Sequence, residues 1–235
     1  MNYKIFPLAL LFTLMSFTSV GTTPIRTKTI TLGKAGFEAK AASLYQNLHA
    51  NNFEMPKFKG FAEALKGYYE LKEKGLIQKD ILTLIDFSLS SNTKRLWVID
   101  MATNDVLMNT FVAHGRNTGE EFADSFSNSD ASFKSSLGFY ATGEIYNGKH
   151  GMSLKLDGLE RGINDNARRR GIVMHAADYV SKTFIKDHQR LGRSQGCPAI
   201  PAELTNEIIQ MIKNKSCLFI YHPSRNYTAK EKVFS

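Results

Sequence analysis

The chain has 235 residues, of which 43% are hydrophobic and 22% are charged. This length suits one globular domain with an extension, and the apolar fraction is sufficient for a hydrophobic core. The moderate charge and frequent aromatic residues exclude a wholly disordered chain. The formal net charge of +8 favours an anionic partner, such as nucleic acid, anionic lipid or an acidic polymer. Solvated lysines that only promote solubility are the alternative.

Residues 1–21 have the pattern of a signal peptide. Lys4 supplies a positive charge, and the run Ile5 to Val20 is almost wholly apolar or hydroxylic. Small residues at Ser19-Val20-Gly21 fit cleavage by a signal peptidase. A membrane anchor is the alternative, but the run contains Pro7 and is short for a span of about 20 apolar residues. We therefore expect export to the periplasm or cell envelope, no stable membrane span after cleavage, and no nucleic-acid partner.

The residues that follow predict a helical N-terminal arm. Residues 22–34 are polar and are expected to form a flexible lead-in, before an arm over residues 35–86. Apolar residues at helical spacing predict one helix over Ala35–Ala50 and a second from Phe58, which Gly75 ends. A third short helix is expected over Lys79–Leu84.

From residue 87 to residue 223 the pattern favours a β-rich domain. The expected strands are Arg95–Met101, Val106–Val112, Ser135–Tyr146, Met152–Leu156, Gly171–His175 and Cys217–Tyr221. A hairpin is expected at residues 102–105, an Asn-Gly turn at residues 147–148, and a helix from Pro201. The predicted fold class is therefore mainly β (α+β), with residues 224–235 as a C-terminal tail.

The two cysteines of the chain, Cys197 and Cys217, have different surroundings. Cys197 lies in the stretch Gly192-Arg193-Ser194-Gln195-Gly196-Cys197-Pro198, where glycines permit tight turns and close approach to a ligand. Arg193 or a protonated histidine would stabilise a thiolate there, and the Gly196 and Cys197 amides would face a developing oxyanion. Cys217 lies in an apolar run typical of a small buried hydrophobe. A disulfide between the two is the alternative in an exported chain.

A cysteine nucleophile needs a base, and the chain offers six histidines. His175 ends the apolar run Gly171-Ile172-Val173-Met174, so a buried strand is expected to present it rigidly. A lone strand-end histidine is more often structural, but the cysteine loop downstream favours His175 as the base. His49, His188 and His222 have contexts typical of surface residues.

These motifs resemble the L,D-transpeptidase (YkuD-like) family, whose signature runs from a histidine through a spacer to Ser/Thr-His-Gly-Cys. His175 followed by Ser194-x-Gly196-Cys197 matches that signature, with Gln195 in place of its second histidine. The subgroup of murein L,D-transpeptidase catalytic domain proteins is similar over roughly residues 85–221. The further segments that carry this likeness are Ala113–Arg116, Phe126–Asn128, Ser135–Tyr140 and Gly192–Pro198. The resemblance implies a β-sandwich catalytic domain at residues 87–223.

The resemblance also implies an enzyme, a cysteine acyltransferase of peptidoglycan stem peptides. Cys197 would attack the carbonyl that links the third stem residue to a terminal D-alanine, releasing D-alanine and forming a thioester. An amine of a neighbouring stem would resolve the thioester into a 3→3 cross-link. His175 would act as the base. The backbone carbonyl of Ala176 would orient its ring, with Asp178 as an alternative.

The remaining expectations concern substrate and inhibitors. Arg193 is the expected carboxylate binder, because its planar fork suits that group, with Ser194 and Gln195 beside it. His114 is expected in the substrate groove or, alternatively, packed in a loop. Carbapenem-type β-lactams are the expected covalent inhibitors. No cofactor and no metal are expected.

Three alternatives stay open. Water in place of an amine would give an L,D-carboxypeptidase, or a hydrolase that releases attached protein. A zinc site would draw on His114, His150, His175 and Cys197, although no tight metal-ligand spacing occurs. A non-enzymatic wall-binding protein would contain a Cys197–Cys217 disulfide. Papain-like peptidases fit less well, because their cysteine normally precedes the histidine.

Overall fold

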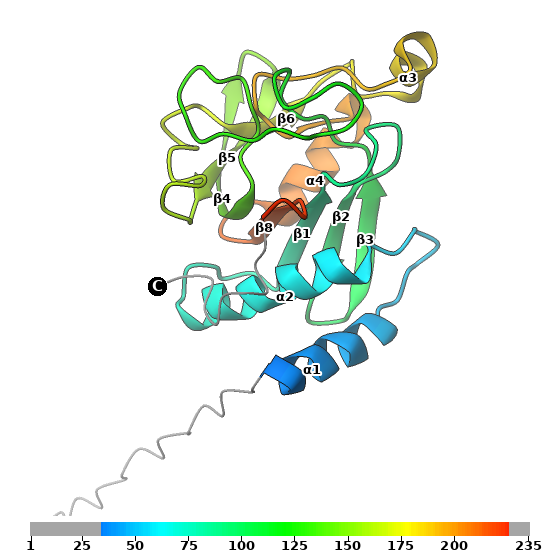
Figure 1. Cartoon of the computed structure of the whole chain (residues 1–235), viewed down its shortest axis with the longest axis vertical. Coiled ribbons are helices and arrows are strands. Elements are labelled where there is room, and N and C mark those ends of the chain that lie inside the picture. Colours follow the sequence, from blue (N-terminus) through cyan, green and yellow to red (C-terminus); the bar gives the residue numbers. More distant parts are fainter. Residues whose placement is uncertain (1–33, 226–235) are drawn as a thin grey trace, which may run out of the picture.

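A computed structural model describes residues 34–225 of the chain (Figure 1). The helices are α1 (Lys34–Gln46), α2 (Phe58–Glu73), α3 (Lys182–His188), the short 3-10 helix η1 (Ala202–Leu204) and α4 (Thr205–Ile212). The strands are β1 (Ile81–Asp86), β2 (Leu96–Asp100), β3 (Asp105–Thr110), β4 (Gly138–Gly148), β5 (Gly151–Gly158), β6 (Val173–Ala176), β7 (Ala199–Ile200) and β8 (Cys217–Tyr221). The expected signal peptide and nearly all of the lead-in and tail lie outside the described residues.

All eight strands belong to one sheet in the order β3-β2-β1-β8-β4-β5-β6-β7. Strand β8 lies inside the sheet, parallel to β1 and antiparallel to β4. The two edges of the sheet approach each other, because Ala113, which follows β3, forms an antiparallel bridge with Ala199 of β7. The sheet is therefore curled, and the chain after β3 meets the chain around β7.

Each face of the sheet has its own hydrophobic core. Helix α2 covers one face, where Phe61 and Leu65 pack with Trp97 and Phe219. Helix α4 covers the other face through its buried isoleucines, such as Ile208. Figure 1 shows α2 and α4 on different sides of the strands. The sheet is thus a rigid support for the segments at its β6–β7 edge.

A glycine sets the distance between α2 and the sheet. A Cβ at Gly67 would lie 2.1 Å from Cζ of Phe139. The Phe139 ring is fully buried and stacks on Phe219, with centroids 4.1 Å apart. Glycine is unfavourable inside a helix, so its presence here is explained by this close approach of a ring.

The expected third helix over Lys79–Leu84 is wrong, because this segment contributes strand β1, Ile81–Asp86. β1 is hydrogen-bonded to β2 on one side and to β8 on the other. A strand buried on both faces has a continuous apolar run instead of alternation, and such a short run is easily mistaken for a helix. The sheet therefore begins inside the range expected to form the helical arm. The division of the chain into domains stays a prediction.

The other expected elements agree with the structure to within a few residues, including the hairpin between β2 and β3 and the last strand, Cys217–Tyr221. Gly75 follows α2 with a φ of 68°, a left-handed conformation that suits a residue ending a helix. Among residues 34–225, no helix has the length and apolar character that a membrane span requires.

Candidate active site

The cysteine loop lies between α3 and β7 and is cross-linked by its own serine. The Ser194 hydroxyl accepts a hydrogen bond from the Gly196 amide at 3.0 Å and donates one to the Cys197 carbonyl at 2.6 Å. Ser194 is buried, so its side chain shapes the loop from within. The Gly196 amide, expected to face an oxyanion, is occupied inside the loop in this structure. The Cys197 amide donates to no acceptor among the described residues, which leaves it available.

A second serine holds the cysteine loop from outside. The Ser135 hydroxyl accepts from the Gly115 amide at 3.0 Å and donates to the Gly196 carbonyl at 3.1 Å. Gly196 has a φ of 119°, and a Cβ there would lie 2.7 Å from the Lys134 carbonyl oxygen. Only glycine fits such a position. The loop is thus pressed against the backbone of residues 115 and 134.

The Cys197 thiol is partly buried, and it lies against the first residue of β6, Val173. Its sulfur lies 3.5 Å from the Val173 amide and 3.8 Å from the Gly171 carbonyl oxygen. Burial raises the pKa of the Cys197 thiol, whereas the Val173 amide and the positive charge of Arg170 lower it. A thiol is a weak nucleophile until it ionises, so this cysteine needs a base.

His175 lies in β6 with its ring fixed by the backbone. Its Nδ1 is 2.8 Å from the carbonyl oxygen of Ala176. A carbonyl only accepts, so Nδ1 carries the proton and Nε2 has a free lone pair in the neutral ring. Burial lowers the pKa of His175, and the charge of His150 lowers it further. Asp178, the alternative orienting group, is exposed.

The sheet brings the cysteine and the histidine onto neighbouring segments. Val173, which contacts the sulfur, is two residues before His175 in the same strand. His175 pairs with Ala199 of β7, two residues after Cys197. Neither of the two polar contacts of the sulfur is to His175 within residues 34–225. Catalytic hydrogen bonds are often long before substrate binds, so the arrangement is compatible with a thiol and its base.

Two hollows lie at the two ends of β6. One, of about 300 Å³, is lined by His150 and by residues Ala176 to Tyr179. The other, of about 360 Å³, is lined by Tyr146, Lys155, Leu156, Arg168 and residues Gly171 to Val173. The first hollow adjoins Ala176, which follows His175, and the second adjoins Gly171 and Val173, which contact the sulfur. The two hollows therefore lie at opposite ends of the strand that carries His175.

His114 lies in a packed loop, so the expectation that it lines the groove is wrong. It is 1% exposed. Its Nδ1 accepts from Arg95 at 2.8 Å, and its Nε2 donates to the carbonyl oxygens of Gly119 and Glu120. Burial, followed by the charge of Arg95, lowers the pKa of His114 to about 4. Neutral and fully engaged, it organises the loop of residues 114–120.

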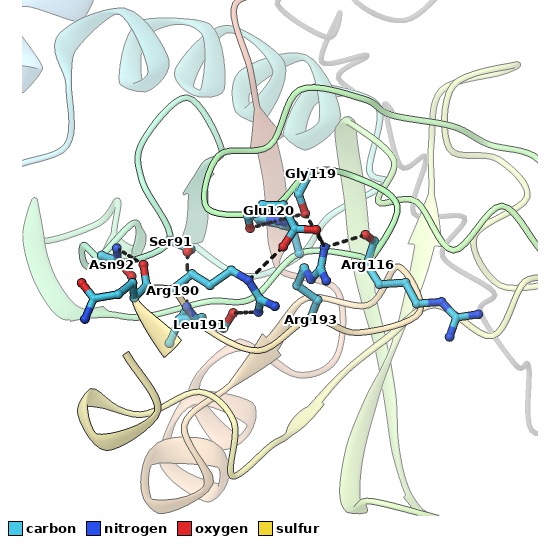
Figure 2. Close-up of polar contacts among 10 residues, drawn as sticks. Ser91, Asn92, Arg116, Gly119, Glu120, Arg190, Leu191 and Arg193 are labelled. Atoms are coloured by element: carbon cyan, nitrogen blue, oxygen red, sulfur yellow. Dashed lines mark hydrogen bonds and ion pairs between the residues drawn. The ribbon is translucent and has the colours of Figure 1, made fainter. Parts of the chain in front are cut away.

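Arg193 binds the same loop and is not a free carboxylate receptor in this structure (Figure 2). Its Nη1 donates to the Arg116 carbonyl at 3.1 Å and to the Glu120 carboxylate at 2.5 Å. Nε of Arg190 lies 3.0 Å from the other oxygen of Glu120. The exposed carboxylate of Glu120 therefore joins two arginines around the cysteine loop. Gln195, next in the loop, is exposed.

The arginine run before β6 is a feature that the sequence interpretation missed. Arg168 binds two acidic residues of β4 and β5, whereas Arg169 binds Asp130. Arg170 donates to four atoms of residues 127–136. Three consecutive arginines before a strand were the available signal, although their partners lie far away in the sequence. The sequence interpretation also did not predict the contact of His150 with His175 or that of Ser135 with the cysteine loop.

The structure bears on two of the alternatives, the disulfide-bonded wall-binding protein and the zinc site. Both cysteines are free, and they pack against cores on opposite faces of the sheet, Cys217 with α2 and Cys197 with α4. The disulfide of the non-enzymatic alternative is therefore contradicted. No group of three or more histidine, cysteine, aspartate or glutamate side chains within the described range is placed to hold a metal ion.

The chain matches the L,D-transpeptidase catalytic domain family over residues 53–221, more than half of its length, and it belongs to that family. The expected family, the mainly β fold and membership in a family of transferases are thereby confirmed. No curated protein matches the chain.

Several solved structures are similar at low identity. An L,D-transpeptidase from Mycobacterium smegmatis is 11% identical, with a TM-score of 0.38, 61% of this chain covered and 59% of that chain. The helical cell shape determining protein Pgp2 from Campylobacter jejuni is 14% identical, with a TM-score of 0.37 and coverages of 65% and 55%. An L,D-transpeptidase from Stackebrandtia nassauensis is 14% identical, with a TM-score of 0.37 and coverages of 82% and 93%. The chain thus spans less than two thirds of the first two, and the family assignment depends on the sequence match.

Proposed function

We propose that this protein is an exported cysteine acyltransferase that acts on peptidoglycan stem peptides and makes 3→3 cross-links. The observation that carries the proposal is the fixed tautomer of His175. Its Nδ1 proton is held by the Ala176 carbonyl at 2.8 Å, and Cys197 is held at the start of the same strand. Acyl transfer by cysteine requires a neutral imidazole with a free Nε2 near the thiol, and β6 carries His175 while its first residue, Val173, contacts the Cys197 sulfur.

In the first half of the reaction, His175 Nε2 takes the thiol proton of Cys197. The sulfur attacks the carbonyl carbon that precedes the terminal D-alanine, and the carbonyl oxygen becomes an oxyanion. The Cys197 amide, which has no acceptor among the described residues, is the proposed hydrogen-bond donor to that oxyanion. The protonated His175 then gives its proton to the departing amine of D-alanine, and a thioester remains on Cys197.

In the second half, an amine of a neighbouring stem attacks the thioester. His175 removes a proton from the attacking amine and returns it to the departing sulfur. The hollow lined by Ala176 and Asp178 suits this acceptor, because Ala176 is the neighbour of His175 and an acidic residue attracts an ammonium group. The second hollow then suits the donor stem, because it is lined by Gly171 and Val173, the residues that contact the Cys197 sulfur.

Water as the acceptor remains the second candidate, giving an L,D-carboxypeptidase. The open hollow beside the base supports it, because water enters wherever an amine can. Export to the cell envelope follows from the pattern of residues 1–21 and from the location of the substrate. Carbapenem-type β-lactams fit the same chemistry, since their strained carbonyl imitates the scissile bond.

The test is incubation with purified muropeptides, followed by mass analysis of the products. The wild-type protein should release D-alanine and form 3→3 dimers, whereas Cys197→Ala should do neither. His175→Ala should slow turnover by about 10² to 10⁴, the typical contribution of general base catalysis. His188→Ala is the matched control, because that histidine is exposed on α3. Trimmed stems without dimers would favour the carboxypeptidase, and turnover by Cys197→Ala would contradict the proposal.

A further inference from the structure

Arg170 binds a single segment, residues 127–136, that packs against the cysteine loop. Its Nη1 donates to the Ser127 carbonyl at 3.0 Å and to the Ser136 hydroxyl at 2.6 Å. Its Nη2 donates to the Ser132 hydroxyl at 3.2 Å and to the Lys134 carbonyl at 2.7 Å. The guanidinium therefore gathers residues 127–136 into one rigid segment. Lys134 and its neighbour Ser135 are the residues of that segment that press on Gly196.

The charge of Arg170 is not neutralised by the groups that hold it. All four of its acceptors within residues 34–225 are carbonyl or hydroxyl oxygens. The nearest acidic residue of the same segment, Asp130, is paired with Arg169 instead. A cation that is half-buried among neutral acceptors projects its field further than one in an ion pair.

Arg170 is also adjacent to the nucleophile's loop. Its Nη2 would lie 3.4 Å from a Cβ placed on Gly196, the residue before Cys197. The contrast with Arg193 is direct, because Arg193 is in the same loop but is paired with Glu120. Chain proximity had favoured Arg193 as the cation for the thiolate, whereas three-dimensional proximity favours Arg170.

We propose that Arg170 is a positioning residue for the acyl transfer, which clamps residues 127–136 on the cysteine loop and supplies the positive charge that stabilises the Cys197 thiolate. The inference rests on the proposed function only for its catalytic consequence, since thiol ionisation is a property of the free protein. In the absence of this charge, burial would raise the pKa of the Cys197 thiol further, and His175 would remove its proton less readily.

The groups that face Cys197 agree with this assignment. From the segment before β6 it is Arg170 that acts on the thiol, together with the Val173 amide, and both lower the pKa of Cys197. After β6, Tyr179 interacts with the thiol, but burial raises the pKa of Tyr179 to about 12, so it is neutral. His175, whose lowered pKa keeps it neutral, adds no fixed charge. Arg170 is thus the permanent cation of the site.

The test is the pH dependence of Cys197 alkylation by iodoacetamide in the full chain, read by intact mass with Cys217→Ala as the background. Arg170→Gln should raise the midpoint pH of alkylation by about one unit, the lower end of the effect of an adjacent opposite charge. Arg170→Lys should restore most of the midpoint, while muropeptide turnover stays below wild type because the fork is lost. Ser136→Ala, a milder change, removes one anchor and should raise the midpoint by less.

Two controls separate charge from general disturbance. Arg169→Gln, from the same run but 62% exposed and paired with Asp130, should leave the midpoint unchanged, and so should Arg193→Gln. Wild-type midpoints in both Arg170→Gln and Ser136→Ala, or an equal shift in Arg193→Gln, would overturn the inference. If Arg170→Gln does not fold, Ser136→Ala decides alone. Failure of the proposed function would be seen separately, as absence of muropeptide turnover in the wild-type protein.

Discussion

The imidazole rings of His150 and His175 stack on each other, with centroids 4.4 Å apart and an interplanar angle of 21°. His150 is exposed at the tip of the hairpin between β4 and β5, whereas His175 is buried within β6. The hairpin therefore covers one face of the proposed base. Because both rings are ionisable, the stack also couples their protonation.

We predict that His150→Ala shifts the acidic limb of the pH profile of kcat/KM to higher pH. Burial, and then the charge of His150, lower the pKa of His175. Removing the covering ring relieves both effects, so the pKa of His175 rises and the base is protonated at a higher pH. The measurement is kcat/KM for muropeptides against pH, with His150→Phe retaining the cover but not the charge. An unchanged acidic limb in His150→Ala would show that the stack has no influence on the base.

A second prediction concerns stability and His114. Its pKa is lowered from 6.5 to about 4 in the folded protein, so the unfolded chain binds an extra proton between these values. The free energy of unfolding should therefore fall as the pH falls from about 6.5 to about 4, by roughly 3 kcal/mol for this group. Urea unfolding at a series of pH values would show it. His114→Gln should flatten that part of the dependence, and an identical slope in the variant would refute the assignment.

A third prediction concerns the contact between α2 and the sheet. Gly67→Ala should destabilise the protein by about 1 to 3 kcal/mol, since an added methyl group would overlap the buried Phe139 ring. Helix propensity alone would make alanine about 1 kcal/mol more stabilising than glycine. The sign of the change in the free energy of unfolding therefore shows whether packing or helix propensity dominates. Thermal unfolding gives the answer. Greater stability in Gly67→Ala would mean that the ring moves aside at little cost.

A fourth prediction separates the two cysteines. Cys217 is fully buried in β8, so Cys217→Ala should lower the free energy of unfolding by about 1 kcal/mol or more and leave the folded fraction active. Cys197→Ala should remove activity with a smaller effect on stability, because its sulfur makes only long contacts. Chemical unfolding and muropeptide turnover measured on both variants give the comparison. Loss of activity in both would place the chemistry elsewhere.

Much of the fold was predictable, because alternating and apolar runs mark most of the strands. The positions of His175 in a buried strand and of Cys197 in a loop were also predictable, since an apolar run leads to the histidine and glycines mark the loop. Strand β1 was missed because a strand buried on both faces lacks alternation. It is nonetheless central to the sheet.

The surroundings of the site were not predictable in the same way. Arg193 and His114 lie in motifs that favoured substrate binding. In the folded chain, however, Arg193 is paired with Glu120, and His114 accepts a hydrogen bond from Arg95. Arg170 and His150 act through partners that the sheet topology brings near. Local sequence contains no signal for such long-range pairs.

The most direct test of Cys197 as the nucleophile is the intact mass of the protein after incubation with a carbapenem. Attack by the Cys197 sulfur on the strained ring carbonyl opens the ring and leaves a stable thioester. We expect one adduct per chain in the wild-type protein and in Cys217→Ala, and no adduct in Cys197→Ala. Chelators should not change the yield. An adduct that persists in Cys197→Ala, or chelator-sensitive turnover with no adduct at all, would contradict Cys197 as the nucleophile.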